Sequence, residues 1–160
     1  TVELSVALVG ELSLHPNIVG IKDSTGDARS LEALAAVCDP SCAVLVGSGD
    51  ALYAALGAGA GGGILAVALL APAECAGLYR AHRAGRMAEA GHLQKPLTLL
   101  HREIVGAHGV AGVKAALDIM GMEGGEPRAP LRALRPDEWE SVAQALRKAG
   151  ILGSVEVPGG

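Results

Sequence analysis

Three short apolar runs alternate with helix-forming segments in the first half of the chain, and this alternation restricts the possible folds more than any other feature. The runs lie at residues 18–22, 43–46 and 63–67, and the residues between them favour helices at 28–37 and 51–56. Such alternation is typical of parallel strands joined by right-handed crossovers. The sequence therefore predicts an α/β fold with about three parallel strands, in an open sheet or in part of a barrel.

The second half of the chain is expected to be purely helical. Beyond Pro72, the apolar spacing favours helices at residues 73–84, 87–106, 110–120 and 137–148, with a loop at 121–130. Pro96 lies inside the second of these helices, where proline favours a kink. A further helix is predicted ahead of the first strand, at residues 2–14, because leucine recurs there at every fourth position.

Length, charge and hydropathy limit the kinds of partner that the chain can have. Its 160 residues suit a single domain, and 13 basic against 17 acidic side chains give a net charge of −4. Because there is no basic run, we expect no binding to nucleic acid or to an anionic membrane surface. The longest strongly apolar stretch, residues 64–71, is too short to span a bilayer. We also expect no secretory signal, since residues 1–3 lack a charged start that leads into an apolar block.

Cysteine and histidine usage gives no sign of a metal site. Cys38, Cys42 and Cys75 form neither an even disulfide framework nor a metal-type spacing with the histidines. We therefore expect free thiols and no bound metal. The five histidines are scattered among charged residues, which favours positions on solvated helix faces.

Lys22 is the residue with the clearest chemical potential. Residues 18–27 read IVGIKDSTGD, so a short apolar strand ends in a lysine and small polar residues follow at once. If the face that Lys22 shares with Ile18 and Gly20 lines a closed cavity, desolvation lowers the pKa of the amine, and a neutral amine attacks carbonyl carbons. A lysine that simply emerges into solvent at a strand end is the more common situation, so the segment alone leaves both interpretations open.

A glycine cluster at residues 57–62 imitates a nucleotide-binding motif. Its sequence, GAGAGG, fits G-x-G-x-x-G. That fingerprint requires a strand before the glycines and a helix after them, whereas here the predicted helix comes first and the strand follows. We therefore expect no dinucleotide cofactor, and a tight turn into the third strand instead.

Several motifs in order along the chain resemble one family of enzymes. Residues 15–24 (HPNIVGIKDS) resemble the Schiff-base lysine strand of the dihydrodipicolinate synthase/N-acetylneuraminate lyase superfamily, and residues 44–49 (VLVGSG) resemble its next strand. Residues 57–68, 112–117 (GVKAAL) and 128–131 (RAPL) resemble its last strand, its C-terminal helix signature and its R-x-P-L loop. Within the superfamily, the combination looks most like 4-hydroxy-2-oxoglutarate aldolase.

The resemblance implies a (β/α)8 barrel and a class I aldolase, with no cofactor and no metal. By this resemblance Lys22, at strand six, forms an imine with a small 2-keto acid, and for 4-hydroxy-2-oxoglutarate the cleavage products are pyruvate and glyoxylate. Ser24 matches the substrate-binding hydroxyl of the family, and Gly47 matches a position where backbone approaches the substrate. Ser48 is a possible neighbour of the substrate. Lys114, in the helix signature, is expected to be structural.

The chain departs from the family pattern in its length. A complete barrel needs about 250 residues, and here the resemblance begins after strand five, so the segments that hold the substrate carboxylate and relay protons in the family have no counterpart. We expect residues 1–72 to supply strands six to eight, residues 73–153 to form the last barrel helix and a C-terminal helical region, and residues 154–160 to be a flexible tail. On its own, the chain is expected to have little or no aldolase activity.

Two other functions remain open from the sequence. The chain could belong to a dihydrodipicolinate synthase or another 2-keto acid aldolase of the superfamily, or it could be a non-catalytic subunit that binds a full-length aldolase. The resemblance also implies a homo-oligomer, a tetramer in the family. It implies a mitochondrial location for a eukaryotic hydroxyoxoglutarate aldolase and a cytoplasmic one otherwise.

Overall fold

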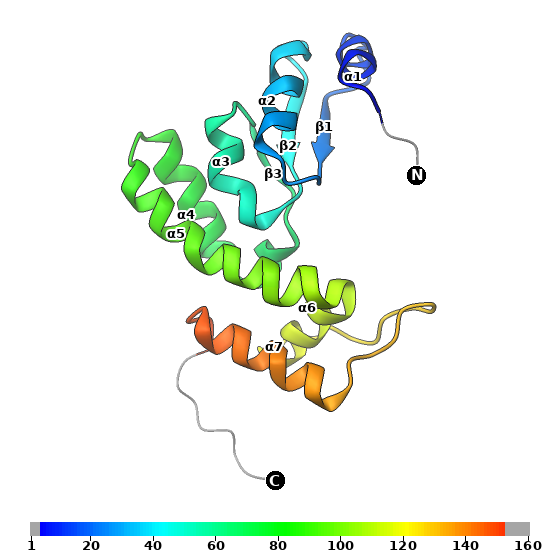
Figure 1. Cartoon of the computed structure of the whole chain (residues 1–160), viewed down its shortest axis with the longest axis vertical. Coiled ribbons are helices and arrows are strands. Elements are labelled where there is room, and N and C mark those ends of the chain that lie inside the picture. The colour runs from blue at the N-terminus through cyan, green and yellow to red at the C-terminus, as the bar shows by residue number, and fades with distance from the viewer. Residues whose placement is uncertain (1–3, 153–160) are drawn as a thin grey trace.

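The chain forms a three-stranded parallel sheet followed by a set of helices. A computed structural model describes residues 4–152. The sheet has the order β1 (Gly20–Asp23), β2 (Ala43–Val46) and β3 (Gly62–Gly63), with Lys22 opposite Leu45 and Val46 opposite Gly63. Helix α2 (Ala28–Val37) connects the first two strands, and the short segment η1 (Gly49–Ala51) with α3 (Leu52–Gly57) connects the next two. This is the α/β arrangement of a partial barrel that the alternating pattern predicts (Figure 1).

Helices cover one face of the sheet and leave the other face open. Val44 and Val46 of β2 are buried, and so are Leu31 and Leu34 of α2. On the opposite face of the sheet Gly20 and Lys22 are exposed. Because strand side chains alternate, the residues of the open face are those that would line the inside of a closed barrel.

Helix α1 (Val6–Ser13) precedes the sheet and packs against α2. The hydroxyl of Ser5 caps it by accepting a hydrogen bond from the Leu8 amide at 3.2 Å. The period-four leucines that predicted this helix are all at least 39% exposed, so they do not form its packed side. The helix is anchored instead by Val9 and by Ser13, whose hydroxyl accepts a hydrogen bond from the Asp39 amide at 2.9 Å.

The second half of the described chain is helical, as predicted. Its elements are α4 (Pro72–Arg83), α5 (Met87–Leu100), the π-helical segment η3 (His101–Gly106), α6 (Ala107–Ile119) and α7 (Pro136–Lys148). Figure 1 shows α4 and α5 side by side and a nearly continuous path from α5 into α6. Leu78, Leu97, Leu100, Ile104 and Leu146 are fully buried and join these helices into one core.

Three predicted elements differ from the observed ones, and the first is the helix predicted at residues 2–14, which begins only at Val6 after the extended Ser5. The strand predicted at residues 63–67 pairs only over Gly62–Gly63, since β2 ends at Val46 and offers no further partner; the chain then turns into the 3-10 segment η2 (Ala66–Leu69). The long helix predicted at residues 87–106 is α-helical only to Leu100 and ends in a π-helical turn, and Pro96 lies within its α-helical part. At Gly109 the backbone leaves helical geometry, with φ of +58°.

Other expectations can be compared with residues 4–152 only. Within this range no helix is both long enough and apolar enough to cross a bilayer, and no three His, Cys, Asp or Glu side chains gather as they would around a metal ion. All three cysteines are free thiols. The flexible tail predicted at residues 154–160 lies outside the described residues.

Candidate active site

The candidate site lies at the carboxyl ends of β1 and β2, on the open face of the sheet. Three of the predicted residues meet there. A Cβ atom added to Gly47 would lie 2.5 Å from Lys22 Cε and 2.9 Å from Ser24 Cβ, and it would overlap Ser24 Oγ. Lys22 and Ser24 therefore occupy the space that a side chain at position 47 would need, which explains why this position takes a glycine.

Backbone and side-chain bonds hold the end of β1 beside the end of β2. The Gly47 amide donates a hydrogen bond to the Asp23 carbonyl at 2.6 Å. The Asp23 carboxylate accepts hydrogen bonds from the Thr25 amide at 2.9 Å and from the Thr25 hydroxyl at 2.8 Å. The turn after β1 is thus closed by a local Asx-type interaction, and this turn places Ser24 next to Lys22.

The surroundings of Lys22 differ from the sheltered channel that would activate it. Lys22 is exposed in this chain, whereas its neighbour Ile21 packs against the helix-side core. The lysine therefore points to the barrel-interior side of the sheet, as a Schiff-base lysine must, but only three strands surround that side. Within residues 4–152 the sheet has three strands, and they leave Lys22 open to water.

Ser48, the fourth predicted residue, faces a different group of side chains. It is buried, with 7% of its surface exposed, and its hydroxyl donates a hydrogen bond to Asp50 Oδ1 at 2.6 Å. Ser48 Oγ also lies 3.1 Å from His101 Nε2. The hydroxyl is therefore engaged on the helix side of the sheet, and Lys22, Ser24 and Gly47 form the candidate site without it.

Sequence reasoning missed the part of this polar group that comes from the helical half. His101 was expected on a solvated helix face, but it contacts Ser48 and the amide of Gly49, 52 residues earlier in the chain. Gln94 was not singled out, yet its amide nitrogen donates to the Gly49 carbonyl at 2.9 Å. The one available signal was their spacing, because residues seven positions apart lie on the same side of a helix.

Asp50 is ionised in this environment. Burial by itself favours the neutral acid, but the hydrogen bond from Ser48 and the hydrogen bond and charge of Arg102 lower the pKa of Asp50 below its usual value. The carboxylate lies 3.4 Å from Arg102 Nε and 3.6 Å from His101 Nε2. The Asp50 carboxylate is therefore the last member of the hydrogen-bonded group that includes His101 and Ser48, and it lies next to Arg102 of η3.

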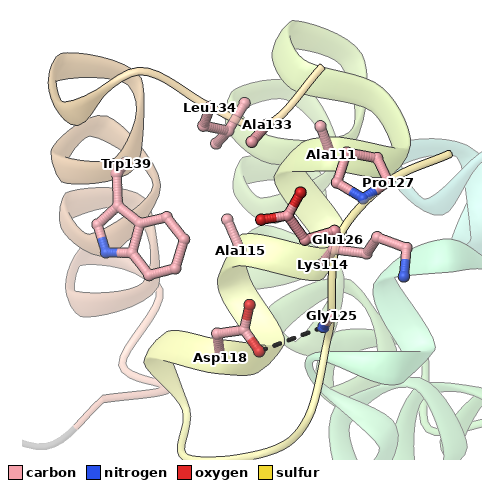
Figure 2. Close-up of a pocket in the computed structure, with 10 residues that line it drawn as sticks. All are labelled: Ala111, Lys114, Ala115, Asp118, Gly125, Glu126, Pro127, Ala133, Leu134 and Trp139. Carbon is pink, nitrogen blue, oxygen red and sulfur yellow. Dashed lines mark hydrogen bonds between the residues drawn. The ribbon is translucent and has the colours of Figure 1, made fainter. Parts of the chain in front are cut away.

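A separate cavity of about 170 Å³ lies between α6, the loop that follows it and α7. Figure 2 shows Trp139 and Glu126 at this cavity, with Lys114 directed away from Trp139. The Lys114 amine donates a hydrogen bond to the Gly124 carbonyl at 2.6 Å, and Asp118 accepts one from the Gly124 amide at 2.7 Å. These two side chains fasten the loop to α6, in agreement with the structural role expected for Lys114.

The fold and the site together define a class of protein. A parallel sheet with helices on its outer side has the arrangement of the C-terminal part of a (β/α)8 barrel, and Lys22 lies at the inner, carboxyl end of one strand. The model of the dihydrodipicolinate synthetase family matches residues 1–149. The chain belongs to this family.

Individual relatives agree with this assignment. The chain is 33% identical over 152 residues to the 4-hydroxy-tetrahydrodipicolinate synthase of Gluconacetobacter diazotrophicus, covering 94% of this chain and 51% of that protein. It is 36% identical over 156 residues to the enzyme of the same name from Rhizobium meliloti, covering 94% and 52%. The chain thus spans about half the length of the curated relatives it matches.

Solved structures share the fold over the same portion. A dihydrodipicolinate synthase from Acinetobacter baumannii, solved in complex with pyruvate, superposes with a TM-score of 0.87 at 31% identity, covering 94% of this chain and 52% of that one. The dihydrodipicolinate synthase of Bacillus anthracis superposes with a TM-score of 0.86 at 27% identity, covering 91% and 50%. The position of Lys22 is therefore best described within the barrel architecture of these relatives.

Proposed function

We propose that this chain supplies the imine-forming lysine of a class I aldolase or lyase. In this reaction the Lys22 amine attacks the keto carbon of a 2-keto acid, and water leaves as a protonated imine forms. The imine withdraws electrons, so that an adjacent C–H or C–C bond can break and leave an enamine. The observation that supports the proposal most directly is the contact of Lys22, Ser24 and Gly47 at the carboxyl ends of neighbouring parallel strands.

We propose pyruvate as the keto acid that the imine holds. The Acinetobacter relative was solved with pyruvate, and the relatives from Gluconacetobacter diazotrophicus and Rhizobium meliloti are 4-hydroxy-tetrahydrodipicolinate synthases. These names favour the dihydrodipicolinate synthase alternative over the cleavage of 4-hydroxy-2-oxoglutarate, the first expectation from the sequence. In the synthetic direction the pyruvate enamine attacks an aldehyde, which is the reverse of an aldol cleavage.

The open inner face limits what the chain does alone. Lys22 is exposed, so the apolar enclosure that favours a neutral amine must come from additional barrel strands. We therefore propose that imine formation by this chain alone is slow and that turnover is negligible. A full barrel, with a homo-oligomeric assembly as in the family, is the proposed active form.

A non-catalytic role, in which the chain only binds a full-length aldolase, is the competing proposal. Val19 and Ile64 are 75% and 57% exposed, as apolar residues that another polypeptide covers would be. The two proposals differ in one respect that can be measured: the catalytic proposal requires covalent chemistry at Lys22, and the binding proposal does not.

Reductive trapping tests the proposed function. The chain is incubated with pyruvate and, separately, with 4-hydroxy-2-oxoglutarate, borohydride is added, and the modified residue is mapped by mass spectrometry. We expect the pyruvate adduct at Lys22, its loss in Lys22→Met, and its retention in Lys95→Met, which alters an exposed lysine of α5. Modification spread evenly over the lysines, or absent from Lys22, would refute the proposal. Co-elution of the untrapped chain with a full-length relative would then favour the binding role.

A further inference from the structure

Two side chains from the helical half of the chain hold the loop after β2, and both of them bind Gly49. The Gly49 amide donates a hydrogen bond to His101 Nδ1 at 3.3 Å, and the Gly49 carbonyl accepts one from Gln94 Nε2 at 2.9 Å. Both side chains come from the continuous helical path of α5 and η3 (Figure 1). The amide and the carbonyl of Gly49 are thus each hydrogen-bonded to a side chain, and these two side chains lie two helical turns apart.

The hydrogen bonds define the protonation of the imidazole. His101 Nδ1 can accept the Gly49 hydrogen only when it carries no proton, so the proton of the neutral ring is on Nε2. Nε2 then donates to Ser48 Oγ, 3.1 Å away, and the Ser48 hydroxyl donates in turn to Asp50 Oδ1 at 2.6 Å. Every donor in this series of three hydrogen bonds has an acceptor, so a single tautomer of His101 satisfies all three contacts.

The other side of Gly49 is closed by the core. A Cβ atom added to Gly49 would overlap Val67 Cγ2 and would lie 3.1 Å from Val67 Cγ1. Val67 is fully buried. The loop therefore cannot move toward the core, and the bonds from α5 and η3 oppose movement in the other direction.

From this arrangement we infer that His101 is a positioning residue for the candidate active site. Gly47 lies two residues before Gly49, and its bare Cα faces the Lys22 and Ser24 side chains. By fixing Gly49, His101 holds Gly47 at the separation that leaves room for these two side chains, and Gln94 assists it. The inference rests on the proposed function for its catalytic consequence, whereas the placement of the loop can be tested without any reaction.

Two measurements on the 160-residue chain test the inference. The first is structural: hydrogen exchange of the Gly49 amide, together with the nuclear Overhauser effect between Gly47 Hα and Lys22 Hε. The second is the rate of borohydride trapping of pyruvate at Lys22. The variants are His101→Leu, which loses both ring contacts, and His101→Asn, whose amide oxygen can still accept the Gly49 hydrogen. The control is His92→Leu, which alters an exposed histidine of the preceding helix, α5.

We expect the Gly49 amide of His101→Leu to exchange roughly tenfold faster, as the loss of about 1.4 kcal/mol of hydrogen bonding gives. The Gly47–Lys22 Overhauser effect should weaken, and trapping should slow several-fold at saturating pyruvate. His101→Asn should recover most of the exchange protection, and His92→Leu should match the parent. A single cooperative thermal transition in each of the three variants shows that the fold is intact.

The outcomes separate the inference from the proposed function. If the Overhauser effect and the Gly49 exchange are the same in His101→Leu and in the parent, the inference is wrong. If they change but trapping at Lys22 keeps its parental rate, the positioning role is also overturned. If the parent itself traps no pyruvate, the proposed function fails, and the placement of the loop by His101 is decided by the two structural readouts alone.

Discussion

Gly47→Ala tests most directly how the candidate site is built. The new Cβ would lie 2.5 Å from Lys22 Cε and 2.9 Å from Ser24 Cβ. Carbon atoms in contact are normally about 3.5–4.0 Å apart, so the Lys22 amine has to move by roughly 1 Å or more. A misplacement of about 1 Å at a reacting group can cost about 100-fold in rate. We therefore expect imine trapping at Lys22 to slow by about two orders of magnitude.

The same substitution should also lower the stability of the fold. Lys22 is exposed and can turn to another rotamer, at a cost of about 0.5–1.5 kcal/mol. Gly47 is not among the glycines with positive φ, so alanine fits its backbone and reduces the entropy of the unfolded chain by about 0.4–1 kcal/mol. These two effects nearly cancel, but Ser24 Cβ lies 2.9 Å from the new atom and moves only with its backbone, so the free energy of unfolding should fall by about 1–3 kcal/mol.

The assay compares the rate of borohydride trapping with pyruvate and the urea midpoint of unfolding for Gly47→Ala and Gly61→Ala. Gly61 is the matched control, because the nearest atom to its added Cβ is Val44 O at 3.8 Å, an ordinary contact. Gly61→Ala should trap pyruvate at the parental rate. Parental trapping by Gly47→Ala would show that the space beside Gly47 has no part in imine formation.

Three further predictions concern stability. In Gly124→Ala the new Cβ would lie 2.7 Å from the backbone carbon of Lys114, which cannot move without α6, so thermal denaturation should show a loss of about 2–3 kcal/mol. Ser13→Ala removes the buried hydroxyl that donates to the Gly10 carbonyl at 2.6 Å and accepts from the Asp39 amide, and urea unfolding should show a loss of about 1–3 kcal/mol. Hydrogen bonds from the Arg132 side chain and the Arg135 amide lower the pKa of Glu138 from its ordinary 4.5 to about 2. Because this pKa is lowered on folding, the stabilisation is complete above pH 4.5 and is lost as the pH falls toward 2, which carboxyl NMR titration measures.

Each of these has its own control. Gly91→Ala places a methyl group where nothing lies within 4 Å, inside helix α5, and it should raise stability by up to about 1 kcal/mol. If Gly124→Ala behaves like Gly91→Ala, the loop after α6 is not packed against Lys114 as described. Ser5→Ala removes an exposed helix cap and should cost less than Ser13→Ala. An ordinary pKa for Glu138 in the folded chain would contradict the Arg132 and Arg135 contacts.

The sequence predicts the sheet and the helical half because their signals are local. Helix α2 and strand β2 have the predicted bounds, since the helix-forming residues at 28–37 and the apolar run at 43–46 define them without reference to the rest of the fold. Strand β3 is shorter than predicted because its length depends on where its partner ends. The predicted strand rested on apolar residues beyond Gly63, which instead form η2.

The candidate site likewise has one part that local sequence signals predict and another part that depends on long-range contacts. Lys22, Ser24 and Gly47 are found through motifs at strand ends, and the register of β1 against β2 brings them together. His101 and Gln94 reach Gly49 from about 50 residues away, and a contact of that range depends on how the helices pack on the sheet. The exposure of Lys22 also escapes local reasoning, because it is set by strands that are not its neighbours in the sequence.

The position of Lys22 separates two requirements of the proposed imine chemistry, the direction of the amine and its protection from water. Orientation comes from β1, which turns Ile21 toward the helices and Lys22 away from them. Activation requires removal of water, and three strands cannot enclose the amine. The two requirements therefore fall to different parts of a barrel: the strand that carries the lysine sets its direction, and strands across the barrel axis would shield it from water. A polypeptide that pairs with the free edges of β1 and β3 should accelerate trapping at Lys22 without altering the contacts of Gly47.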